Sequence, residues 1–416
     1  MNRIISPATF SGSTKVPPSK SYLQRAIAIA AMANHAVEID GYAPSNDVDA
    51  AIAIAKNMGA EVEIHQQKII VQGNFNAANI SAIHCGEAGL SARMFAPVVA
   101  LKEEKIIITG ESSLLKRPMY MVIEALQQLG KTVKSNNGLL PLEISGKLIP
   151  QKIKIDASES SQLLSGLLIA LPFANGDSEI EVTQLNSIPY IQMTLDILRH
   201  FRINIQHRNY QYFIIKGNQK VQSTNYIAEG DWSGAAFHLV AAAIAGNVEL
   251  EGLNKNSAQA DKAILEALQN VGAKINWISD TAIITEKEKL CAFDFDATHC
   301  PDLFPPLAAL AANCNGISKI KGIHRLLHKE SNRAISIQSE LQKLGIKVEL
   351  KNDEMWIYGG KISGGKIYSH NDHRIAMMGA VLALNADAPI EIEAAEAIQK
   401  SYPDFFEDFI ASQISR

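Results

Sequence analysis

The sequence predicts an α/β protein with two similar domains, each built from three βαβαββ units. A motif recurs in which a helix ends at an apolar residue and a glycine, and a strand follows at once. Its marker positions are 71, 72, 70 and 73 residues apart: Gly59, Gly130, Arg202, Gly272 and Gly345. Glycine just past a helix end favours the left-handed conformation that stops a helix. The 416-residue chain holds about six units of this length, and so constant a period argues against coincidence.

Each unit is expected to contain two helices and several short strands. A helical face precedes Gly130, with Met119, Val122, Ile123 and Leu126. Short β-rich runs at 68–72 and 212–215 predict strands. Further helices are expected at 160–172 and 233–245. These elements fit mixed blocks that are too large for the common helical solenoid repeats.

A polar, turn-rich segment at 217–225 places the domain boundary near residue 229. The N-terminal domain is therefore expected to span 14–229, and the C-terminal domain 1–13 together with 230–416. The short β-rich run at 3–5 could belong to either half.

Composition excludes several classes of protein. Hydrophobic residues make up 47% and charged residues 20%, which suits folded domains with proper cores. The net charge of -4 gives no reason to expect nucleic acid or an anionic membrane as a partner. The longest apolar runs are too short to cross a bilayer. Four scattered cysteines, Cys85, Cys291, Cys300 and Cys314, suit reduced thiols in a cytoplasmic protein better than disulfides or a zinc site.

The first candidate site is the stretch 17–25, where two prolines precede Ser19, Lys20, Ser21 and Arg25. Helix formers follow, so a helix is expected to begin near Ser19. The free N–H groups and dipole of a helix N-terminus favour an anion, and the two bases add positive charge. The stretch therefore predicts a phosphate or carboxylate site. A capped surface helix with incidental bases is the alternative, because the glycines of a Walker loop are missing.

Four further stretches of the first half combine polar or small residues with an expected helix start. The loop 85–93 has two glycines, which would allow a ligand close to the backbone, before a helix that carries Arg93. The pair Lys116-Arg117 precedes a proline suited to a first helical turn. Hydroxyl and amide groups open helices at 158–162 and 187–190. Tight loops and simple helix caps are the alternatives.

The acids lie in the second half. Asp302 stands at the head of an apolar helix, as a cap or as a general base. Glu330 and Arg333 are expected on one helical face, as an ion pair or as part of a site. Four polar residues, 371–374, open another helix and are harder to explain as solvation. Lys400 lies in the segment 399–404, which is expected to open the last helix.

Nearly all these stretches lie at expected helix N-termini, and they come from both halves. If the domains face each other with these ends inward, their cleft gathers the bases Lys20, Arg25, Arg93, Arg117, Arg333, Arg374 and Lys400. Such a cationic site suits substrates with several negative charges. Asp302 and Glu330 would supply acid–base chemistry. No metal-ligand spacing or nucleotide loop is present in the sequence, so no metal or cofactor is expected.

In this order the motifs resemble those of the 5-enolpyruvylshikimate-3-phosphate (EPSP) synthase family over essentially the whole chain. The resemblance is most specific in Asn371-Asp372-His373-Arg374 combined with Lys329-Glu330 and Arg333. It extends to Pro18–Ser21 with Arg25, Gly86–Arg93, Arg117-Pro118, Ser160–Gln162, Pro301-Asp302, and Lys400 with Tyr402–Asp404. The family fold, two inverse α/β barrel-like domains of three βαβαββ units with the active site in the cleft, agrees with the repeat count.

The resemblance implies transfer of the enolpyruvyl group of phosphoenolpyruvate to the 5-hydroxyl of shikimate 3-phosphate, with release of phosphate. It implies that Asp302, Glu330 and Lys20 are catalytic. Phosphoenolpyruvate would be held by Lys20, Gly89, Arg117, Gln162, Arg333, Arg374 and Lys400. Shikimate 3-phosphate would be held by Lys20, Ser21, Arg25, Ser160, Ser161, Gln162, Ser187, Tyr190, Asp302 and Lys329. The N-terminal domain would mainly hold shikimate 3-phosphate, and the C-terminal domain would mainly supply phosphoenolpyruvate binding and acid–base groups.

The chain departs from the family pattern at several positions: Pro17-Pro18 in place of Pro-Gly, Glu87, Leu90, Lys116 and Arg325. Glu87 stands where Asn is usual, and a second acid beside an anionic substrate is repulsive unless a base pairs with it. These departures predict an altered response to glyphosate and leave the reaction class unchanged.

Two other functions compete with this one. The enolpyruvyl transferase that acts on UDP-N-acetylglucosamine typically has a reactive Cys in the loop that here spans 111–117, which contains none. A non-catalytic anion-binding protein would not need both Asp302 and Glu330. A monomer is expected, because two domains would enclose the site within one chain.

Overall fold

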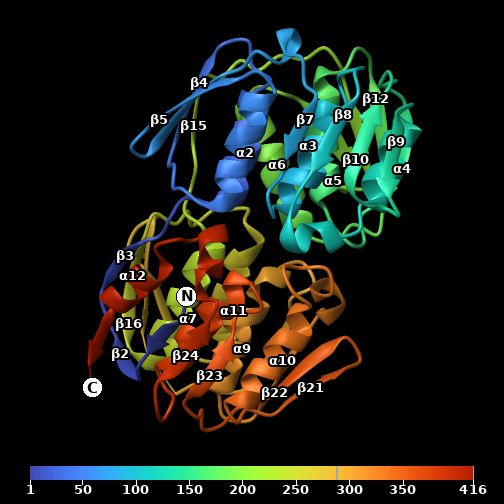
Figure 1. The fold of residues 1–416 in the computed structure, drawn as a ribbon. Helices are drawn as coiled ribbons and strands as arrows, with labels where there is room; N and C mark the ends of the chain where they lie inside the picture. Colours follow the sequence, from blue (N-terminus) through green and yellow to red (C-terminus); the bar gives the residue numbers. More distant parts are fainter. Residues whose placement is uncertain (287–288, 416) are drawn as a thin grey trace. The chain divides into compact units, whose positions relative to one another are not determined.

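The computed structural model describes residues 1–286 and 289–415 (Figure 1). The chain forms two compact units. The N-terminal unit is Pro18–Ala228, and the C-terminal unit joins Met1–Pro17 to the chain from Glu229 onward. Among the described residues, no helix is both long and apolar enough to span a bilayer.

The N-terminal unit contains three repeats of helices and strands. The first repeat has α1 (Lys20–Ala30), β4 (Ala36–Asp40), α2 (Asn46–Asn57), β5 (Glu61–His65) and β6 (Lys68–Gln72). The second has β7 (Ala82–His84), α3 (Gly89–Val99), β8 (Ile106–Thr109), α4 (Tyr120–Gln128), β9 (Thr132–Asn136) and β10 (Leu139–Ser145). The third has β11 (Lys152–Asp156), α5 (Gln162–Ala170), β12 (Ser178–Thr183), α6 (Ile188–His200), β13 (Ile205–Arg208) and β14 (Tyr212–Ile215), followed by β15 (Asn225–Ile227).

The three sheets of this unit share one topology. Their strand orders are β15-β4-β6-β5, β7-β8-β10-β9 and β11-β12-β14-β13. In each sheet the first pair is parallel and the other two pairs are antiparallel. The parallel partner of β4 is β15, so the end of the third repeat completes the sheet of the first.

The C-terminal unit repeats this plan. Its N-terminal strands are β1 (Arg3–Ile5), β2 (Ala8–Phe10) and β3 (Ser13–Lys15). Its fourth repeat has α7 (Trp232–Ala245), β16 (Asn247–Glu251), α8 (Ile264–Asn270), β17 (Lys274–Trp277) and β18 (Ala282–Glu286). The fifth has β19 (Asp294–Asp296), α9 (Phe304–Ala312), β20 (Ile317–Lys321), α10 (Arg333–Lys343), β21 (Val348–Lys351) and β22 (Glu354–Tyr358). The sixth has β23 (Gly365–Tyr368), α11 (His373–Ala383), β24 (Ile390–Glu393), α12 (Phe405–Ala411) and β25 (Gln413–Ser415).

The N-terminal strands complete the sheets of the C-terminal unit. Strand β3 pairs in parallel with β16, and β1 pairs antiparallel with β24. Strand β2 pairs with β25. The run at 3–5 therefore lies in the C-terminal unit. Residues 14–17, expected in the N-terminal domain, lie here as well because β3 is a strand of this unit's sheet.

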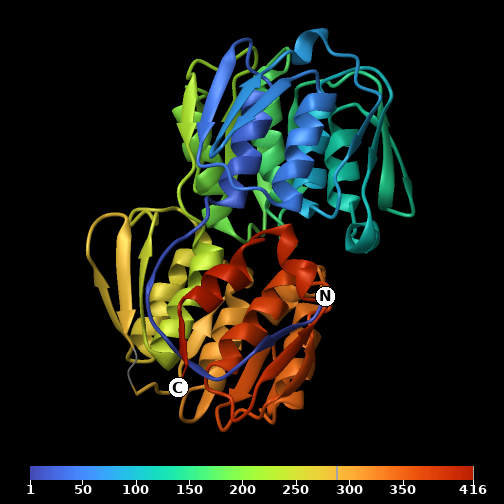
Figure 2. The same cartoon turned by 60° about the vertical axis from the view of Figure 1, so that its left-hand side comes forward.

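Buried helices form the core of each unit, and the sheets lie outside them (Figures 1 and 2). In the N-terminal unit these core helices are α1, α3 and α5. In the C-terminal unit α7, α9 and α11 are buried on nearly all sides. The predicted α/β architecture is confirmed.

The repeat marker is a left-handed residue after a helix, as predicted. The φ angles are 91° at Gly59, 81° at Gly130, 90° at Gly272 and 82° at Gly345. Arg202, which replaces glycine in the fifth copy of the motif, has a φ of 64°. The backbone geometry is thus kept where the glycine is lost, although a side chain makes that conformation less favourable.

Two helix starts differ from the expectation. Glu330 was expected inside a helix with Arg333, but α10 begins at Arg333, so Glu330 lies in the turn before it. Lys400 was expected to open the last helix. It ends a short 3-10 helix, η7 (Ala395–Lys400), and α12 begins at Phe405. In both places the polar residues belong to the turn that leads into the helix.

We expect Arg202→Gly to stabilise the protein by up to about 1 kcal/mol, because glycine adopts a positive φ without a steric penalty. Arg202→Val should destabilise it by about 1–2 kcal/mol, since a β-branched residue is strained there. Urea unfolding of the variants would measure both effects. The matched control is Arg208→Gly in β13, which should destabilise the protein. If Arg202→Gly and Arg208→Gly lowered the free energy of unfolding equally, the backbone at Arg202 would not be strained.

Candidate active site

The three core helices of the N-terminal unit end at a common cavity. Its volume is about 610 Å³, and its lining includes Met32, Leu101 and Phe173, which follow the C-terminal ends of α1, α3 and α5. The N-terminal ends therefore lie about 14–16 Å away, at the other end of helices of this length. Those N-terminal ends carry Lys20, Gly89 and Gln162. The predicted residues thus occupy the helix ends that favour anions.

Gly89, Arg117 and Gln162 lie together, as the anion-site prediction requires. A Cβ atom at Gly89 would lie 2.8 Å from Nη1 of Arg117, 3.3 Å from Nη1 of Arg93 and 3.7 Å from Oε1 of Gln162. Nη1 of Arg93 donates a hydrogen bond of 2.8 Å to Oε1 of Gln162. A side chain at position 89 would therefore fill the space beside two guanidinium groups. Glycine keeps this space and the N-terminal end of α3 accessible to an anion.

Arg25 is a buried cation with neutral partners. Its side chain is 1% exposed. Nε donates to Oγ1 of Thr194 at 2.9 Å, Nη1 to the carbonyl of Ser21 at 2.8 Å, and Nη2 to Oγ of Ser165 at 3.3 Å. Burial lowers the pKa of Arg25 to about 10, and Tyr190 is among the phenols that oppose this shift. At neutral pH the guanidinium is still charged, and this arrangement suits an anionic ligand.

Lys20 is already paired with an acid that the sequence did not indicate. Its Nζ lies 2.8 Å from Oδ2 of Asp47, and both side chains are mostly buried. Asp47 lies in the first turn of α2 after the N-cap Ser45, a position that favours an acid. The pairing joins residues 27 positions apart, so no local sequence pattern indicates it.

The predicted serines lie at the starts of α5 and α6. The Ser160 hydroxyl accepts a hydrogen bond of 3.2 Å from the backbone N–H of Gln162. Ser161 is buried, and Ser187 has a φ of 61° immediately before α6. Tyr190 lies in the first turn of α6. These residues therefore surround the starts of two helices. The N-cap of α5 is Ser161, and its side chain makes no capping hydrogen bond.

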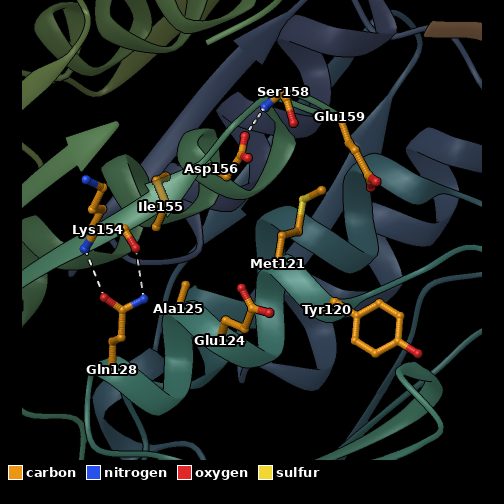
Figure 3. Close-up of a pocket in the computed structure, with 10 residues that line it drawn as sticks. All are labelled: Tyr120, Met121, Glu124, Ala125, Gln128, Lys154, Ile155, Asp156, Ser158 and Glu159. Carbon is orange, nitrogen blue, oxygen red and sulfur yellow. Dashed lines mark hydrogen bonds between the residues drawn. The ribbon is translucent and has the colours of Figure 1, made fainter. Parts of the chain in front are cut away.

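The strand that leads to these serines is held at its free edge by Gln128. The amide of this α4 residue accepts from the backbone N–H of Lys154 and donates to its carbonyl, both at 2.9 Å (Figure 3). The side chain thus pairs with β11 as a neighbouring strand would. The same face forms a small pocket that also includes Ser158 and Glu159 (Figure 3). This pairing fixes the strand before the serine loop.

The C-terminal unit contains an arginine–carboxylate cluster of three acids and three bases. Its members are Asp302, Lys329, Glu330, Arg333, Asp372 and Arg374. Asp302 accepts hydrogen bonds from Lys329 at 3.1 Å and from Arg333 at 2.8 Å, and it forms an ion pair of 3.1 Å with Nη2 of Arg374. The structure thus brings five of the predicted residues together, and Asp372 joins them.

Arg333 is the centre of this cluster and is fully buried. Its guanidinium contacts Asp302, Glu330 and Asp372, with Nε 2.9 Å from Oδ2 of Asp372. Burial lowers the pKa of Arg333, but the three carboxylates outweigh burial and raise the pKa overall. Asp372 is also the N-cap of α11 and accepts from the N–H of Arg374 at 3.0 Å. Asp372, the acid of the predicted 371–374 motif, therefore has a structural role that was not assigned from the sequence.

The surrounding charges keep Asp302 ionised. Burial raises the pKa of Asp302, but Arg374, Lys329 and Arg333 outweigh burial and hold this pKa well below 3.8. Burial lowers the pKa of Lys329. Arg374 keeps a raised pKa despite its burial, mainly because of Asp302. The cluster therefore combines an ionised carboxylate with cations that can exchange partners for an anionic substrate.

The last predicted residue, Lys400, lies next to the 371–374 turn. Its Nζ donates to the carbonyl of Asn371 at 3.0 Å. The nearby Tyr402 hydroxyl donates to Asp408 at 2.7 Å, which holds the turn after η7. Lys400 is therefore placed beside the residues that open α11. Within residues 1–286 and 289–415, no group of His, Cys, Asp and Glu side chains could hold a metal ion.

The fold and the candidate site define an α/β protein with cationic side chains gathered at the N-termini of buried helices. The family model for EPSP synthase (3-phosphoshikimate 1-carboxyvinyltransferase) matches residues 5–409. A 3-phosphoshikimate 1-carboxyvinyltransferase of Clostridium novyi is 36% identical over 97% of this chain and 96% of that protein. One from Clostridium botulinum is 37% identical over 98% and 96%. The EPSP synthase structure from Acinetobacter baumannii has a TM-score of 0.84 and 27% identity, covering 100% of this chain and 98% of that one. The chain belongs to the EPSP synthase family.

We expect Asp372→Ala to destabilise the C-terminal unit by about 3–5 kcal/mol, because it removes a buried partner of Arg333. Asp372→Asn should cost less, since its amide oxygen can still cap α11. Urea unfolding would compare these variants with Asp294→Ala, a control on an exposed aspartate of β19. If Asp372→Ala unfolded like the control, the buried pair would not be the stabilising interaction.

Proposed function

We propose that this chain transfers the enolpyruvyl group of phosphoenolpyruvate to the 5-hydroxyl of shikimate 3-phosphate and releases phosphate. The observation that carries the proposal is the arginine–carboxylate cluster, because it combines an ionised base with three cations. Full-length similarity to 3-phosphoshikimate 1-carboxyvinyltransferases supports the substrate pair. The product would belong to chorismate and aromatic amino acid biosynthesis.

Both units would contribute to substrate binding. For shikimate 3-phosphate, the buried guanidinium of Arg25 would meet an anion, and the proposed ligands in the N-terminal unit are Lys20, Ser21, Arg25, Ser160, Ser161, Gln162, Ser187 and Tyr190. Asp302 and Lys329 would complete its binding. For phosphoenolpyruvate, the proposed ligands are Lys20, Gly89, Arg117, Gln162, Arg333, Arg374 and Lys400. The two groups around Gly89 and around Arg333 support this assignment by their geometry.

The proposed reaction is an addition followed by an elimination. Asp302 takes the proton of the 5-hydroxyl as its oxygen bonds to C2 of phosphoenolpyruvate, while C3 gains a proton. Loss of a C3 proton and cleavage of the C2–O bond to phosphate then give the enol ether product. Glu330 and Lys20 would serve the proton transfers at C3 and at the bridging oxygen. The fixed cations stabilise the charge that develops during both steps.

Substrate binding should rearrange the ion pairs of the cluster. Arg374 and Arg333 both contact Asp302 in the structure. A carboxylate or phosphate of a substrate would compete with Asp302 for these guanidinium groups. Each contact transferred from Asp302 to the substrate would also raise the proton affinity of Asp302. Substrate binding would therefore make Asp302 a stronger base at the step in which it accepts the proton of the 5-hydroxyl.

The rival acceptor is UDP-N-acetylglucosamine. Arg25, with its neutral partners, favours the phosphate of shikimate 3-phosphate instead. We further propose that the protein is a cytoplasmic monomer. The described cysteines are free thiols, which is compatible with a reducing compartment.

The test is phosphate release from phosphoenolpyruvate with shikimate 3-phosphate or with UDP-N-acetylglucosamine as the acceptor. We expect release with the shikimate alone. Release only with the sugar nucleotide would keep the reaction class and replace the acceptor. Release with neither would overturn the proposed activity.

Asp302→Ala should lower kcat by about 10²–10⁴-fold, because it removes the proposed general base. Phosphoenolpyruvate binding, measured by calorimetry, should be retained or strengthened, since three cations lose a competing carboxylate. Asp294→Ala should leave both unchanged. Equal kcat values for Asp302→Ala and the wild type would refute the general-base role.

Glu87 is proposed to weaken phosphoenolpyruvate binding, because it precedes Gly89 in the loop beside two guanidinium groups. We expect Glu87→Asn to lower KM for phosphoenolpyruvate by up to about fivefold, as one partly solvated carboxylate is removed. Steady-state kinetics would measure this change in KM, with Glu111→Gln as the control. An unchanged or higher KM would contradict this role, and glyphosate inhibition curves of the same variants would test the predicted altered response.

A further inference from the structure

The chain enters α11 through a turn of two residues, His370 and Asn371, that both have left-handed backbone conformations. Their φ angles are 54° and 53°. This conformation is unfavourable for residues with a side chain, and two such residues in succession persist only where surrounding contacts hold them. The turn leads directly to Asp372 and Arg374 of the arginine–carboxylate cluster. The contacts that hold it therefore bear on the candidate site.

Glu340, in α10, is a buried acid that holds this turn and has no role in the proposed reaction. Its carboxylate is fully buried, and Oε1 accepts a hydrogen bond of 2.6 Å from Nε2 of His370. Oε2 accepts from the backbone N–H of Tyr368 at 2.9 Å and from Nζ of Lys343 at 2.7 Å. Burial raises the pKa of Glu340, but these donors outweigh burial and lower the pKa overall. Glu340 is therefore an ionised carboxylate that contacts the chain at two points just before the turn.

Two ion pairs of opposite polarity attach the turn to α10. Glu340 follows Arg333 by seven residues, so both side chains lie on one face of the helix, about 10.5 Å apart along its axis. Nε of Arg333 lies 2.9 Å from Oδ2 of Asp372, at the end of the turn. Glu340 contacts His370 at its beginning. The segment 370–372 is therefore fixed to α10 at both ends.

The turn places two groups of the candidate site. The carbonyl of Asn371 accepts a hydrogen bond of 3.0 Å from Nζ of Lys400. Three residues further on, Nη2 of Arg374 forms its ion pair of 3.1 Å with Asp302. Lys400 and Arg374 are both proposed ligands of phosphoenolpyruvate, whereas most proposed ligands of shikimate 3-phosphate belong to the N-terminal unit. A change in the turn would therefore act mainly on phosphoenolpyruvate.

We propose that Glu340 is a positioning residue that sets the affinity for phosphoenolpyruvate by holding the turn 370–371 in its left-handed conformation. Glu340 acts through His370 and the turn on Lys400 and Arg374. Without Glu340 the turn populates the more favourable conformations of residues with side chains, and only a fraction of the molecules is ready to bind. The apparent affinity falls by that fraction, and saturating substrate restores the bound conformation. This inference rests on the proposed function, because it takes phosphoenolpyruvate as the substrate.

The first experiment measures kcat and the KM of each substrate for the wild type and Glu340→Gln by phosphate release. Glu340→Gln keeps the shape of the side chain but removes its charge and one acceptor oxygen. We expect the KM for phosphoenolpyruvate to rise about tenfold, the effect of one lost hydrogen bond to a charged group. The kcat and the KM for shikimate 3-phosphate should stay within about twofold of the wild type. A merely structural loss would instead lower kcat through the loss of folded protein and leave both KM values unchanged.

Two variants of His370 test the turn itself. Both remove the donor to Oε1 of Glu340, but glycine adopts a positive φ without a steric penalty. His370→Ala should therefore raise the KM for phosphoenolpyruvate about tenfold, and His370→Gly should raise it about threefold or less. These variants also decide the question if Glu340→Gln does not fold.

The control is His207, which contacts a similar turn in the N-terminal unit. Its Nδ1 accepts a hydrogen bond of 3.3 Å from the backbone N–H of Tyr210. Asn209 and Tyr210 are both left-handed, with φ angles of 50° and 58°. His207→Ala should leave kcat and both KM values unchanged, because this turn carries no proposed ligand. Thermal melting gives the folded fraction of each variant.

The outcomes separate this inference from the proposed function. A KM for phosphoenolpyruvate that is unchanged in Glu340→Gln, or that rises together with the KM for shikimate 3-phosphate, overturns the role of Glu340 alone. Equal KM values in His370→Ala and His370→Gly overturn it as well. Wild-type protein that releases no phosphate overturns the proposed function and this inference with it. A rise confined to phosphoenolpyruvate, with His370→Gly between the wild type and His370→Ala, supports the inference.

Discussion

The buried guanidinium of Arg333 is the constraint on which the C-terminal half of the candidate site depends. It contacts acids from three separate elements: Asp302 at the start of α9, Glu330 in the turn before α10, and Asp372 at the N-cap of α11. A buried charge is tolerated only when its partners are fixed and well oriented. The same contacts therefore fix the positions of three helix starts and hold the carboxylate of Asp302, the proposed general base, in place.

The buried charge of Arg25 is stabilised by neutral groups instead of carboxylates. Its hydrogen bonds go to two hydroxyls and a carbonyl, and burial lowers its pKa only to about 10. To bind a substrate oxygen as proposed, Arg333 would have to give up a carboxylate partner, whereas Arg25 would gain an anion without losing one. The two units thus contain two kinds of buried cation: Arg25, which has neutral hydrogen-bond partners, and Arg333, which is paired with carboxylates.

Local sequence patterns account for the features that could be predicted from the sequence. The period of about 71 residues identified the repeats, and even the glycine-free copy at Arg202 keeps a positive φ. Helix starts identified Lys20, Asp302 and the 371–374 motif. Asp47 and Asp372 pair with bases from distant segments, so no local pattern assigns these pairings. The strand β3 likewise joins β16 through a pairing of residues more than 230 positions apart, which the linear order conceals.

The repeated helix arrangement of the two units also explains why Asp302 would need a neighbouring acid to act as a general base. Both units place side chains at the N-termini of three buried helices, where the backbone favours negative charge. In the N-terminal unit this field would assist the proposed binding directly. In the C-terminal unit Arg374, Lys329 and Arg333 stabilise the ionised form of Asp302, and so weaken it as a base. A carboxylate in such a cationic site is therefore a poor general base unless another negative group lies close to it. Glu330, which shares Arg333 with Asp302, is such a group, because its negative charge opposes the lowering of the Asp302 pKa by the three cations.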